Sequence, residues 1–360
     1  MKKDCLIISM FPKDETVFAQ YYIKQLEENN KTFDIIYFER YDMDAVAAEN
    51  EILFKRYCPT GGKKSSKLLI MAQYARFIRN HLKSGNYSSA IILTTVPGVM
   101  CADILKRRFS GKYIFDIRDY THESNSIYYK TVKSLIDHST FTTISSKGFL
   151  SFLPESGKYK LVHNINIDCV KKDHYQTPDS GMTTIGFVGS VRYYNENAEL
   201  IRQFANCNNY QLVYYGNITN DCDLPGYCQE NSISNVSFKG HFNNSKKDEI
   251  YQTINIINSI YGLSSGLETK TAMPNRFYDA AIYKIPILVS KDTFLEKEVN
   301  HYKIGFAVDI FKDDVKDLLE AYLKNFNQEE FEAGCDRLLS DVNNDMEAFK
   351  TAIIHFVSEI

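Results

Sequence analysis

Short apolar runs alternate with amphipathic stretches along the whole chain. The apolar runs, rich in β-branched residues, are residues 5–11, 33–39, 89–97, 184–190, 210–216 and 236–242. Between them, apolar positions recur three and four residues apart, as in residues 12–29 and in the helix expected from about Asn195. This alternation predicts parallel strands connected by helices. We therefore expect an α/β protein, with a Rossmann-like parallel sheet beginning at the first strand.

The alternation occurs as two series separated by a polar segment that contains Pro178 and Gly181. A length of 360 residues also suits two domains, each able to bury its own core. The predicted organisation is a first domain, a linker, a second domain and a final amphipathic helix that returns to the first domain. These comprise residues 1–168, 169–182, 183–344 and 345–360.

Residues 271–290 predict a loop, a short helix and a buried strand. Pro274 favours an extended entry, and Asn275 is a candidate helix cap. A helix that begins beside parallel strands favours phosphate, because its free amides and its dipole both attract anions. Arg276 and Asp279 fall on the side of this helix opposite its apolar face. The alternative is an ordinary helix–strand unit in which Asp279 is a solvated charge.

The second series begins with a strand followed by Gly189, which permits a tight turn, and by Arg192. A guanidinium suits paired phosphate oxygens. The loop at residues 10–16 contains no glycine, so a dinucleotide fingerprint is absent. The acidic pair at residues 221–223 lies in a turn-rich loop and is interpreted as a chance match to a metal motif. No histidine pair has metal-ligand spacing, so neither a metal nor another cofactor is expected.

Charged side chains also gather after the strand predicted near residues 112–117. They are Asp116, Arg118, Asp119, His122 and Glu123. Ligands of open parallel sheets bind outside the carboxyl ends of the strands, which is where these residues fall. The alternative is a structural network of salt bridges.

Residues 52–102 contain no Asp or Glu. Their basic residues between positions 55 and 83 are Lys55, Arg56, Lys63, Lys64, Lys67, Arg76, Arg79 and Lys83. Part of this stretch has helical apolar spacing, and basic amphipathic helices bind anionic lipid surfaces. A solvated helix face is the alternative. A Walker loop is rejected at residues 61–67, because no strand and no GK[ST] geometry frame them.

The composition describes a globular protein with a net charge of -3, which argues against bulk nucleic-acid binding. Its eight cysteines are scattered, without a CxxC pair, as in reduced cytosolic proteins. The first residues are too short and too polar for a signal peptide, and no apolar run approaches the roughly 20 residues of a membrane span. We expect a soluble cytoplasmic protein, with peripheral attachment to the inner face of a bacterial membrane as a hypothesis.

Three segments, residues 112–124, 184–192 and 274–290, resemble bacterial GT-B glycosyltransferases close to glycosyltransferase family four. The resemblance implies two Rossmann-like domains that face a central cleft. It implies transfer of a sugar from a nucleotide-diphosphate sugar, with UDP-sugar expected, to a glycan or lipid-linked oligosaccharide. It further implies retention of configuration without a metal, in capsule or surface-polysaccharide synthesis.

The resemblance also implies roles for individual residues. Asp279 would hold the donor ribose, Arg192 would neutralise the leaving diphosphate, and the loop at Gly240 would meet the base. The residues that bind the donor would be Gly189, Ser190, Arg192, Gly240, His241, Thr271, Pro274, Asn275, Arg276 and Asp279. The residues on the acceptor side would be Asp119, His122 and Glu123. The catalytic residues would be Arg192, Asp119 and His122. Two departures are that Asp279 replaces the usual Glu and that Thr271 replaces a second acidic residue.

Two alternative functions remain open. A nucleotide-sugar 2-epimerase shares the fold but needs paired acid and base groups. A non-catalytic partner of another glycosyltransferase would retain the fold while losing sugar contacts, and the missing acidic residue at Thr271 fits that hypothesis.

Overall fold

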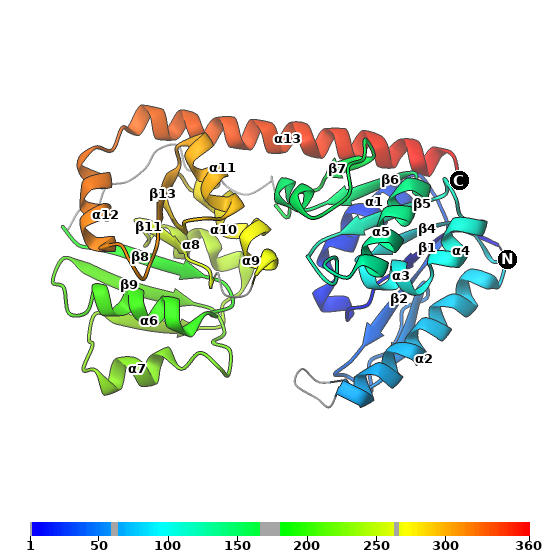
Figure 1. Ribbon diagram of the computed structural model, residues 1–360, viewed down its shortest axis with the longest axis horizontal. Helices are drawn as coiled ribbons and strands as arrows, with labels where there is room; N and C mark the ends of the chain where they lie inside the picture. Colours follow the sequence, from blue (N-terminus) through cyan, green and yellow to red (C-terminus); the bar gives the residue numbers. More distant parts are fainter. Residues whose placement is uncertain (1, 59–63, 166–180, 263–265) are drawn as a thin grey trace. The chain divides into compact units, whose positions relative to one another are not determined.

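The computed structural model describes residues 2–58, 64–165, 181–262 and 266–360 of the chain. The chain divides into two compact units, one formed by Met1–Asn164 with Asn344–Ile360 and the other by Ile165–Asn343. Each unit contains one sheet covered by helices (Figure 1). Most of the expected linker, residues 169–180, lies outside the described residues.

The sheet of unit 1 has seven strands in the described residues, all paired in parallel. The strands are β1 (Lys3–Ile8), β2 (Phe33–Glu39), β3 (Glu51–Lys55), β4 (Tyr87–Leu93), β5 (Tyr113–Ile117), β6 (Phe141–Ile144) and β7 (Tyr159–Leu161). Their order is β3-β2-β1-β4-β5-β6-β7. The direction of winding therefore reverses between β1 and β4. Ligands of such sheets bind at this switch point, outside the carboxyl ends of the strands.

Helices cover both faces of the first sheet, and side chains alternate between two cores. The helices are η1 (Lys13–Glu15), η2 (Val17–Ala19), α1 (Gln20–Glu28), α2 (Lys64–Lys83), α3 (Thr95–Met100), α4 (Ala102–Arg108), α5 (Ser126–His138) and η3 (Lys147–Ser151). Along β1, Leu6 and Ile8 join a cluster that contains Tyr74 of α2. Cys5 and Ile7 join the opposite cluster. Burial on both faces explains why this strand is apolar without interruption.

The sheet of unit 2 has six parallel strands in the described residues, in the order β10-β9-β8-β11-β12-β13. The strands are β8 (Thr183–Val188), β9 (Tyr210–Tyr215), β10 (Val236–Gly240), β11 (Ile256–Ser259), β12 (Ile287–Ser290) and β13 (Gly305–Val308). The helices are α6 (Tyr194–Gln203), α7 (Leu224–Glu230), η4 (Asn244–Lys246), α8 (Lys247–Tyr251), α9 (Leu267–Thr271), α10 (Asn275–Ile282), α11 (Phe294–Tyr302), α12 (Val315–Lys324) and α13 (Gln328–Ser358). Here the switch point lies between β8 and β11.

The predicted α/β class with two parallel sheets is confirmed. Two local predictions are wrong. The final helix, predicted from residue 345, is the second half of a longer helix, α13, that begins at Gln328, and no proline interrupts residues 328–358. Its last turns pack Phe349 and Ile353 into unit 1. Strand β3 was not predicted, because its side chains are mostly half-buried at a sheet edge and give a weak pattern.

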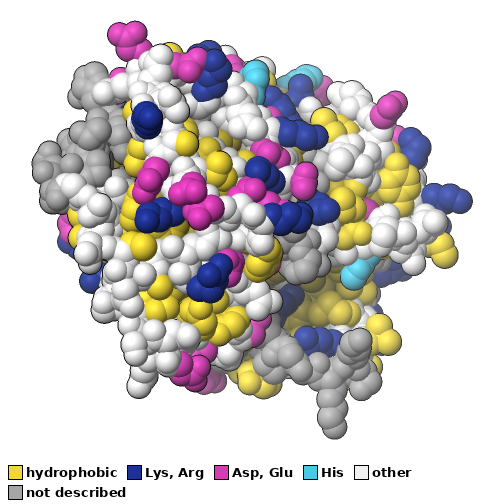
Figure 2. All heavy atoms as spheres, turned by 60° about the vertical axis from the view of Figure 1, so that its left-hand side comes forward, with side chains coloured by type: hydrophobic (Ala, Val, Ile, Leu, Met, Phe, Trp, Pro, Cys, Tyr) yellow, Lys and Arg dark blue, Asp and Glu magenta, His cyan; other side chains and the backbone are white. Residues whose placement is uncertain are grey.

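Helix α2 packs Tyr74, Ile78 and Leu82 against the first sheet, so its apolar side faces the core. Its first described turns still expose Leu68 and Leu69. No helix in the described part of the chain is both long and apolar enough to cross a bilayer. On the face drawn in Figure 2, basic and acidic side chains lie interspersed with hydrophobic ones.

Candidate functional site

The predicted phosphate-binding segment forms α10, which differs from its prediction in two details. The helix begins at Asn275 with Pro274 in the N-cap position, and no side chain caps it. Asn275 is therefore the first helical residue and not the cap. All residues from Arg276 to Ile282 are buried, including Asp279. The interpretation of Asp279 as a solvated charge is wrong, because α10 lies between neighbouring elements and has no solvated face.

The Arg276 side chain lies at the switch point of the second sheet. Its Nη1 donates to the carbonyl oxygen of Val188 over 3.1 Å, and its Nε donates to Oγ of Ser259 over 3.3 Å. Val188 ends β8 and Ser259 ends β11, so the guanidinium joins the two strand ends. It stacks 4.0 Å above the Phe187 ring and is 7% exposed. No carboxylate of the described residues pairs with this buried cation.

Three glycines bring the loops after β8, β9 and β10 close to this cation. Gly216 has φ +136, and a Cβ there would lie 1.8 Å from the carbonyl oxygen of Gly189. Gly216 N donates to the carbonyl of Gly240 over 2.7 Å. A Cβ at Gly189 would lie 3.1 Å from Nη1 of Arg276. At Gly216 only glycine permits this close approach. The guanidinium itself is bordered by backbone and by aromatic and hydroxyl side chains.

Arg192 lies in the loop between β8 and α6 and is exposed. Its guanidinium makes no hydrogen bond or ion pair with the residues that the structure describes. The next residue, Tyr193, has φ +62 at the N-cap of α6, which is unusual for a bulky side chain. Its ring lies 5.3 Å from that of Tyr261, which also borders Arg276. Burial raises the pKa of Tyr193 to about 12, so its hydroxyl stays neutral.

The Asp279 carboxylate contacts α8. It accepts hydrogen bonds from Nζ of Lys247 over 3.0 and 2.9 Å, and from the hydroxyl of Tyr251 over 2.7 Å. Burial, followed by the charge of Asp279, raises the pKa of Tyr251 well above its usual value. Asp248 accepts from Tyr283 in return, over 2.5 Å. These bonds fix α8 against α10 and place an ammonium beside the predicted ribose carboxylate.

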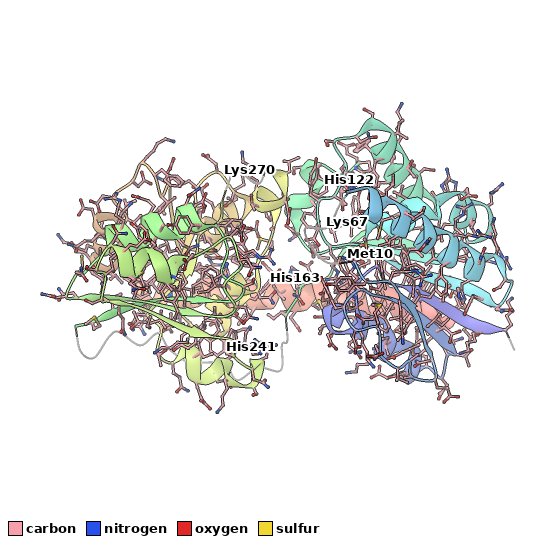
Figure 3. All side chains as sticks on the ribbon, turned by 90° about the horizontal axis from the view of Figure 1, so that it is seen from below. Met10, Lys67, His122, His163, His241 and Lys270 are labelled. Atoms are coloured by element: carbon pink, nitrogen blue, oxygen red, sulfur yellow. The ribbon has the colours of Figure 1, made fainter. Side chains whose placement is uncertain are left out.

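Of the remaining predicted donor residues, Thr271 is already hydrogen-bonded within its own helix, and Ser190 and His241 are exposed. The Thr271 hydroxyl donates to the Leu267 carbonyl over 2.7 Å within α9, and its side chain is buried. Ser190 is exposed in the loop after β8. His241, exposed after β10, and Lys270, exposed on α9, are both labelled in Figure 3.

The acidic pair at residues 221–223 has a structural explanation. Asp223 caps α7 by accepting from Gly226 N over 2.9 Å. Across the described ranges, no three His, Cys, Asp or Glu side chains are grouped so that they could hold a metal ion.

In unit 1, the charged residues at the carboxyl end of β5 separate into two groups. Asp116 and Arg118 form a buried ion pair with atoms 2.6 and 2.9 Å apart, and Tyr22 donates to the same carboxylate. The salt-bridge alternative therefore holds for these two residues. Asp119 and His122 are exposed, and His122 is labelled in Figure 3.

Two buried polar atoms near the switch point of the first sheet have no hydrogen-bond partner. They are Oγ1 of Thr94 and Oε1 of Glu123, in side chains that are 8% and 5% exposed. Thr94 directly follows β4 and has φ +74, a strained conformation for a β-branched residue. An unmet buried polar atom costs about 1–3 kcal/mol. Sequence analysis identified Glu123 but missed Thr94, because a threonine after a strand carries no signal of its own.

Neighbouring side chains form a hydrogen-bonded cluster that ends on the other oxygen of Glu123. The Thr95 and Thr121 hydroxyls lie 2.9 Å apart, and Tyr128 donates to Thr95 over 2.8 Å. Thr121 N donates to Oε2 of Glu123 over 2.6 Å. Burial raises the pKa of Tyr128 to about 12, and His122 meets its ring edge-on at 5.5 Å. The cluster thus offers hydroxyls and one carboxylate, without a cation among its named members.

Comparison with known proteins supports the fold. No family model and no curated protein matches the sequence. Anabaena HepE in complex with UDP is 11% identical over 99% of this chain and 100% of that chain, with a TM-score of 0.66. The apo lipopolysaccharide outer core galactosyltransferase WaaB is 15% identical over 98% of this chain and 99% of that chain, with a TM-score of 0.64.

A third neighbour is a putative UDP-N-acetylglucosamine 2-epimerase from Listeria monocytogenes, 11% identical over 97% of this chain and 98% of that chain, with a TM-score of 0.57. Identities this low establish architecture only. The chain has the GT-B fold. Glycosyltransferases are among the structures that share this fold, and the fold alone does not assign a function.

Proposed function

We propose that the protein is a glycosyltransferase that binds a nucleotide-diphosphate sugar in unit 2 and an acceptor hydroxyl in unit 1. The observation that carries the proposal is the buried guanidinium of Arg276. It lies at the ends of β8 and β11 with a carbonyl and a hydroxyl as partners. A buried cation without a carboxylate is unfavourable unless an anion completes it, and a diphosphate supplies one. UDP is the proposed nucleotide, as in the complex of the HepE neighbour.

In this proposal, Arg276 and the exposed Arg192 stabilise negative charge on the diphosphate as the glycosidic bond breaks. The backbone around Gly189 lets phosphate oxygens approach the guanidinium. The proposed mechanism needs no metal, since the two arginines supply the positive charge. Retention of anomeric configuration is part of the proposal, and proton NMR of the product tests it, because an inverted anomeric signal would contradict it.

The donor ribose is proposed to meet the Lys247–Asp279 pair, with the ammonium donating to one hydroxyl and the carboxylate accepting from the other. The loop at Gly240 and His241 is proposed to border the base. We expect 2′,3′-dideoxy-UDP to bind about tenfold more weakly than UDP, the loss of one good hydrogen bond. The Asp279→Asn variant should lose this discrimination, and discrimination that persists in it would exclude Asp279 from ribose binding.

The acceptor side is proposed to consist of Glu123 and Thr94, with Asp119 and His122 at the exposed rim. Their unpartnered oxygens suit a ligand that brings hydroxyl groups, as a glycan or a lipid-linked oligosaccharide does. Glu123→Gln should reduce transfer about a hundredfold while leaving UDP affinity unchanged. A variant that transfers at the normal rate would remove Glu123 from the site.

Thermal melting with UDP, GDP, CMP and ADP tests the proposal directly. A nucleotide at 100 times its dissociation constant adds about 2.7 kcal/mol of stability, a shift of several degrees. We expect UDP to produce it. If none of these nucleotides shifts the melting temperature, the donor site does not exist as proposed.

Turnover then separates the alternative functions. A 2-epimerase would convert a UDP-sugar to its epimer without any acceptor, and the Listeria neighbour makes that outcome worth measuring. A non-catalytic partner would bind UDP but turn over no UDP-sugar with any acceptor extract. Release of UDP that depends on an added acceptor supports the transferase.

Attachment to an anionic membrane through residues 55–83 is a separate proposal. It is supported by exposed Leu68, Leu69 and Tyr57 beside the exposed Arg76. Arg79 does not contribute, because it pairs with Asp103. Binding to phosphatidylglycerol vesicles but not to phosphatidylcholine vesicles is expected, with loss at high salt. Equal binding to both vesicles would refute the electrostatic component.

A further inference from the structure

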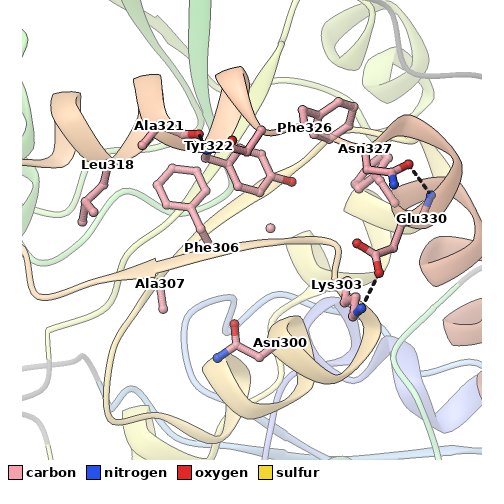
Figure 4. A pocket seen from close by; sticks show the side chains of 13 residues that line it. Asn300, Lys303, Phe306, Ala307, Leu318, Ala321, Tyr322, Phe326, Asn327 and Glu330 are labelled. Atoms are coloured by element: carbon pink, nitrogen blue, oxygen red, sulfur yellow. Dashed lines mark hydrogen bonds and ion pairs between the residues drawn. The ribbon is translucent and has the colours of Figure 1, made fainter.

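A pocket of about 460 Å³ opens at the free edge of the second sheet (Figure 4). Strand β13 ends the strand order, so within the described residues no strand pairs with its outer edge. The lining residues come from α11, β13, α12 and the beginning of α13, and none of them belongs to the donor set described above. The pocket therefore needs an explanation of its own.

Aromatic rings form one wall of the pocket. The Phe306 and Tyr322 rings stack with centroids 4.8 Å apart, Phe326 lies 5.7 Å from Tyr322, and Phe331 lies 5.2 Å from Phe326. All but Phe331 remain partly exposed. Figure 4 shows the Phe306 and Tyr322 rings side by side at the pocket. Such rings offer an apolar surface at little entropic cost.

Amide side chains form the polar part. Asn327 Oδ1 accepts from Glu330 N over 3.1 Å, and Asn325 Nδ2 donates to the Ala321 carbonyl over 2.8 Å. In the side chain of Asn300, neither the oxygen nor the amino group has a hydrogen-bond partner among the residues described here. Asn325 keeps a spare oxygen and Asn327 a spare amino group. The pocket thus presents both donors and acceptors.

The charges at the rim neutralise one another. Lys303 pairs with Glu330, as the dashed line in Figure 4 marks. The lining contains no other charged side chain. A phosphate or a carboxylate ligand would find no unpaired cation here, so a neutral ligand fits the pocket better.

We infer that this pocket binds a short neutral saccharide, at a second site separate from the proposed donor and acceptor sites. A pyranose ring has an apolar C–H face, which matches the aromatic wall, and a rim of hydroxyls, which matches the amides. Ligand pockets hold about 300–1,000 Å³ and combine apolar walls with a few polar groups. The inference does not rest on the donor site, and a glycan held here would keep an acceptor or product chain on the enzyme.

An extended peptide pairing with β13 fits less well. The strand offers only Gly305–Val308, and side chains of α11, α12 and α13 line the pocket beside it. Pairing of a strand needs a longer continuous edge. A hydrocarbon chain would bury the amides of Asn300 and Asn327 without partners, which is unfavourable.

Protein-observed NMR titration with maltose, cellobiose and lactose at millimolar concentration tests the inference on the full chain. We expect at least one of them to bind, with shifts at Ala307 and Asn325. Tyr322→Ala should weaken binding about tenfold and Asn300→Ala about threefold. Asn208→Ala is the matched control, because Asn208 is an exposed asparagine of unit 2 outside the pocket.

Three results would overturn the inference: no saccharide binds, binding is unchanged in both Tyr322→Ala and Asn300→Ala, or Asn208→Ala weakens it equally. Asn300 is exposed, so its variant is informative even if Tyr322→Ala fails to fold. The stabilisation by UDP should be unchanged in Asn300→Ala. Failure of UDP to bind the wild type would refute the donor site and leave the saccharide result standing.

Discussion

The two sheets share a winding order, yet their switch points carry opposite chemistry. In unit 2, the ends of β8 and β11 are joined by the buried cation of Arg276. In unit 1, the region after β4 holds the unpartnered oxygens of Thr94 and Glu123. One place lacks an anion, and the other lacks hydrogen-bond donors. The same architecture thus carries different chemistry at its two switch points, because the fold fixes the position and the sequence fixes the side chains there.

The two switch points also differ in how their backbones are built. Unit 2 uses glycine at Gly189 and Gly216, where positive φ and close backbone approach leave no room for a side chain. Unit 1 places Thr94 at φ +74, where glycine would be relaxed. Strain of this kind persists where a side chain is needed for function. The two switch points therefore differ in backbone: unit 2 has a close backbone approach that needs glycine, and unit 1 has a strained residue that carries a hydroxyl.

The largest effect is expected at Gly216. A Cβ 1.8 Å from the Gly189 carbonyl forces the loops apart, so Gly216→Ala should lower the free energy of unfolding by at least about 3 kcal/mol. Denaturant unfolding measures this. Gly240→Ala is the control, since Gly240 has φ +68 but no atom within 4 Å of the added Cβ, and it should cost only about 1 kcal/mol. Equal losses would contradict the close approach.

Arg276→Met should weaken UDP binding about a hundredfold, or about 2.7 kcal/mol, because charge-assisted hydrogen bonds to the diphosphate are lost. Titration calorimetry measures the change. The matched variant Arg202→Met removes an exposed arginine that pairs with Glu199 in the same unit and should leave affinity unchanged. If both variants bind UDP like the wild type, the anion site is not at this switch point.

Thr94→Gly should stabilise the protein by about 1 kcal/mol while reducing acceptor-dependent activity. Relief of strain and removal of the unmet hydroxyl outweigh the added flexibility of glycine in the unfolded chain. Thermal and denaturant unfolding measure the gain. Thr94→Ala separates the two causes, since it removes the hydroxyl but keeps the strain. Loss of stability with normal activity would make Thr94 a structural residue.

Breaking an exposed ion pair away from both switch points should change the free energy of unfolding only a little. Arg79 and Asp103 form such a pair. A hydrogen bond from Arg79 lowers the pKa of Asp103 to about 2. The folded pKa lies below the unfolded value, so this pair stabilises above about pH 4 and loses its effect as pH falls toward 2. Because Asp103 is 42% exposed, Asp103→Asn should cost less than about 1 kcal/mol at pH 7.

Unfolding of the wild type and Asp103→Asn at pH 7 and pH 2.5 tests this, since the difference should shrink at the lower pH. If Asp103→Asn lowered the free energy of unfolding at pH 7 by as much as about 2.7 kcal/mol, the expectation that an exposed ion pair contributes little would be wrong. Asp137→Asn, whose exposed ion pair to Lys133 spans 3.7 Å, should change stability even less.

Much of the fold could be predicted from the sequence. Runs such as residues 33–39 predicted a buried strand with the observed bounds, Phe33–Glu39. Burial on both faces of a parallel strand requires continuous apolar residues, so the signal is strong. Strand β3 was not predicted, because it lies at the edge of the sheet, where half-exposed side chains give only a weak apolar pattern. The beginning of α13 was predicted at residue 345 instead of Gln328, because amphipathic spacing does not show where a helix begins.

The candidate site was predicted only in part. Gly189 and Glu123 were named from their places after predicted strands, and Arg276 from the helix predicted in residues 271–290 and from the family resemblance. The structure puts Gly189 beside Arg276. The sequence did not predict that Arg276 is buried and has no carboxylate partner among the described residues. The spacing of apolar residues in this helix had placed Arg276 on the polar face. Asp279 was named for ribose, but its contact with Lys247 joins residues 32 positions apart.

The sequence by itself predicted most of the strands, their parallel pairing and the sheet edge at which ligands of this architecture bind, because apolar periodicity and chain order are local properties. Tertiary structure alone decided which partners the buried polar groups received. Arg276 received a carbonyl and a hydroxyl but no carboxylate of the described residues, and Oγ1 of Thr94 received no partner. Hydrogen-bond partners such as Arg276 and Val188 are far apart in the sequence and meet only in the folded chain, so a local pattern of residues does not predict them.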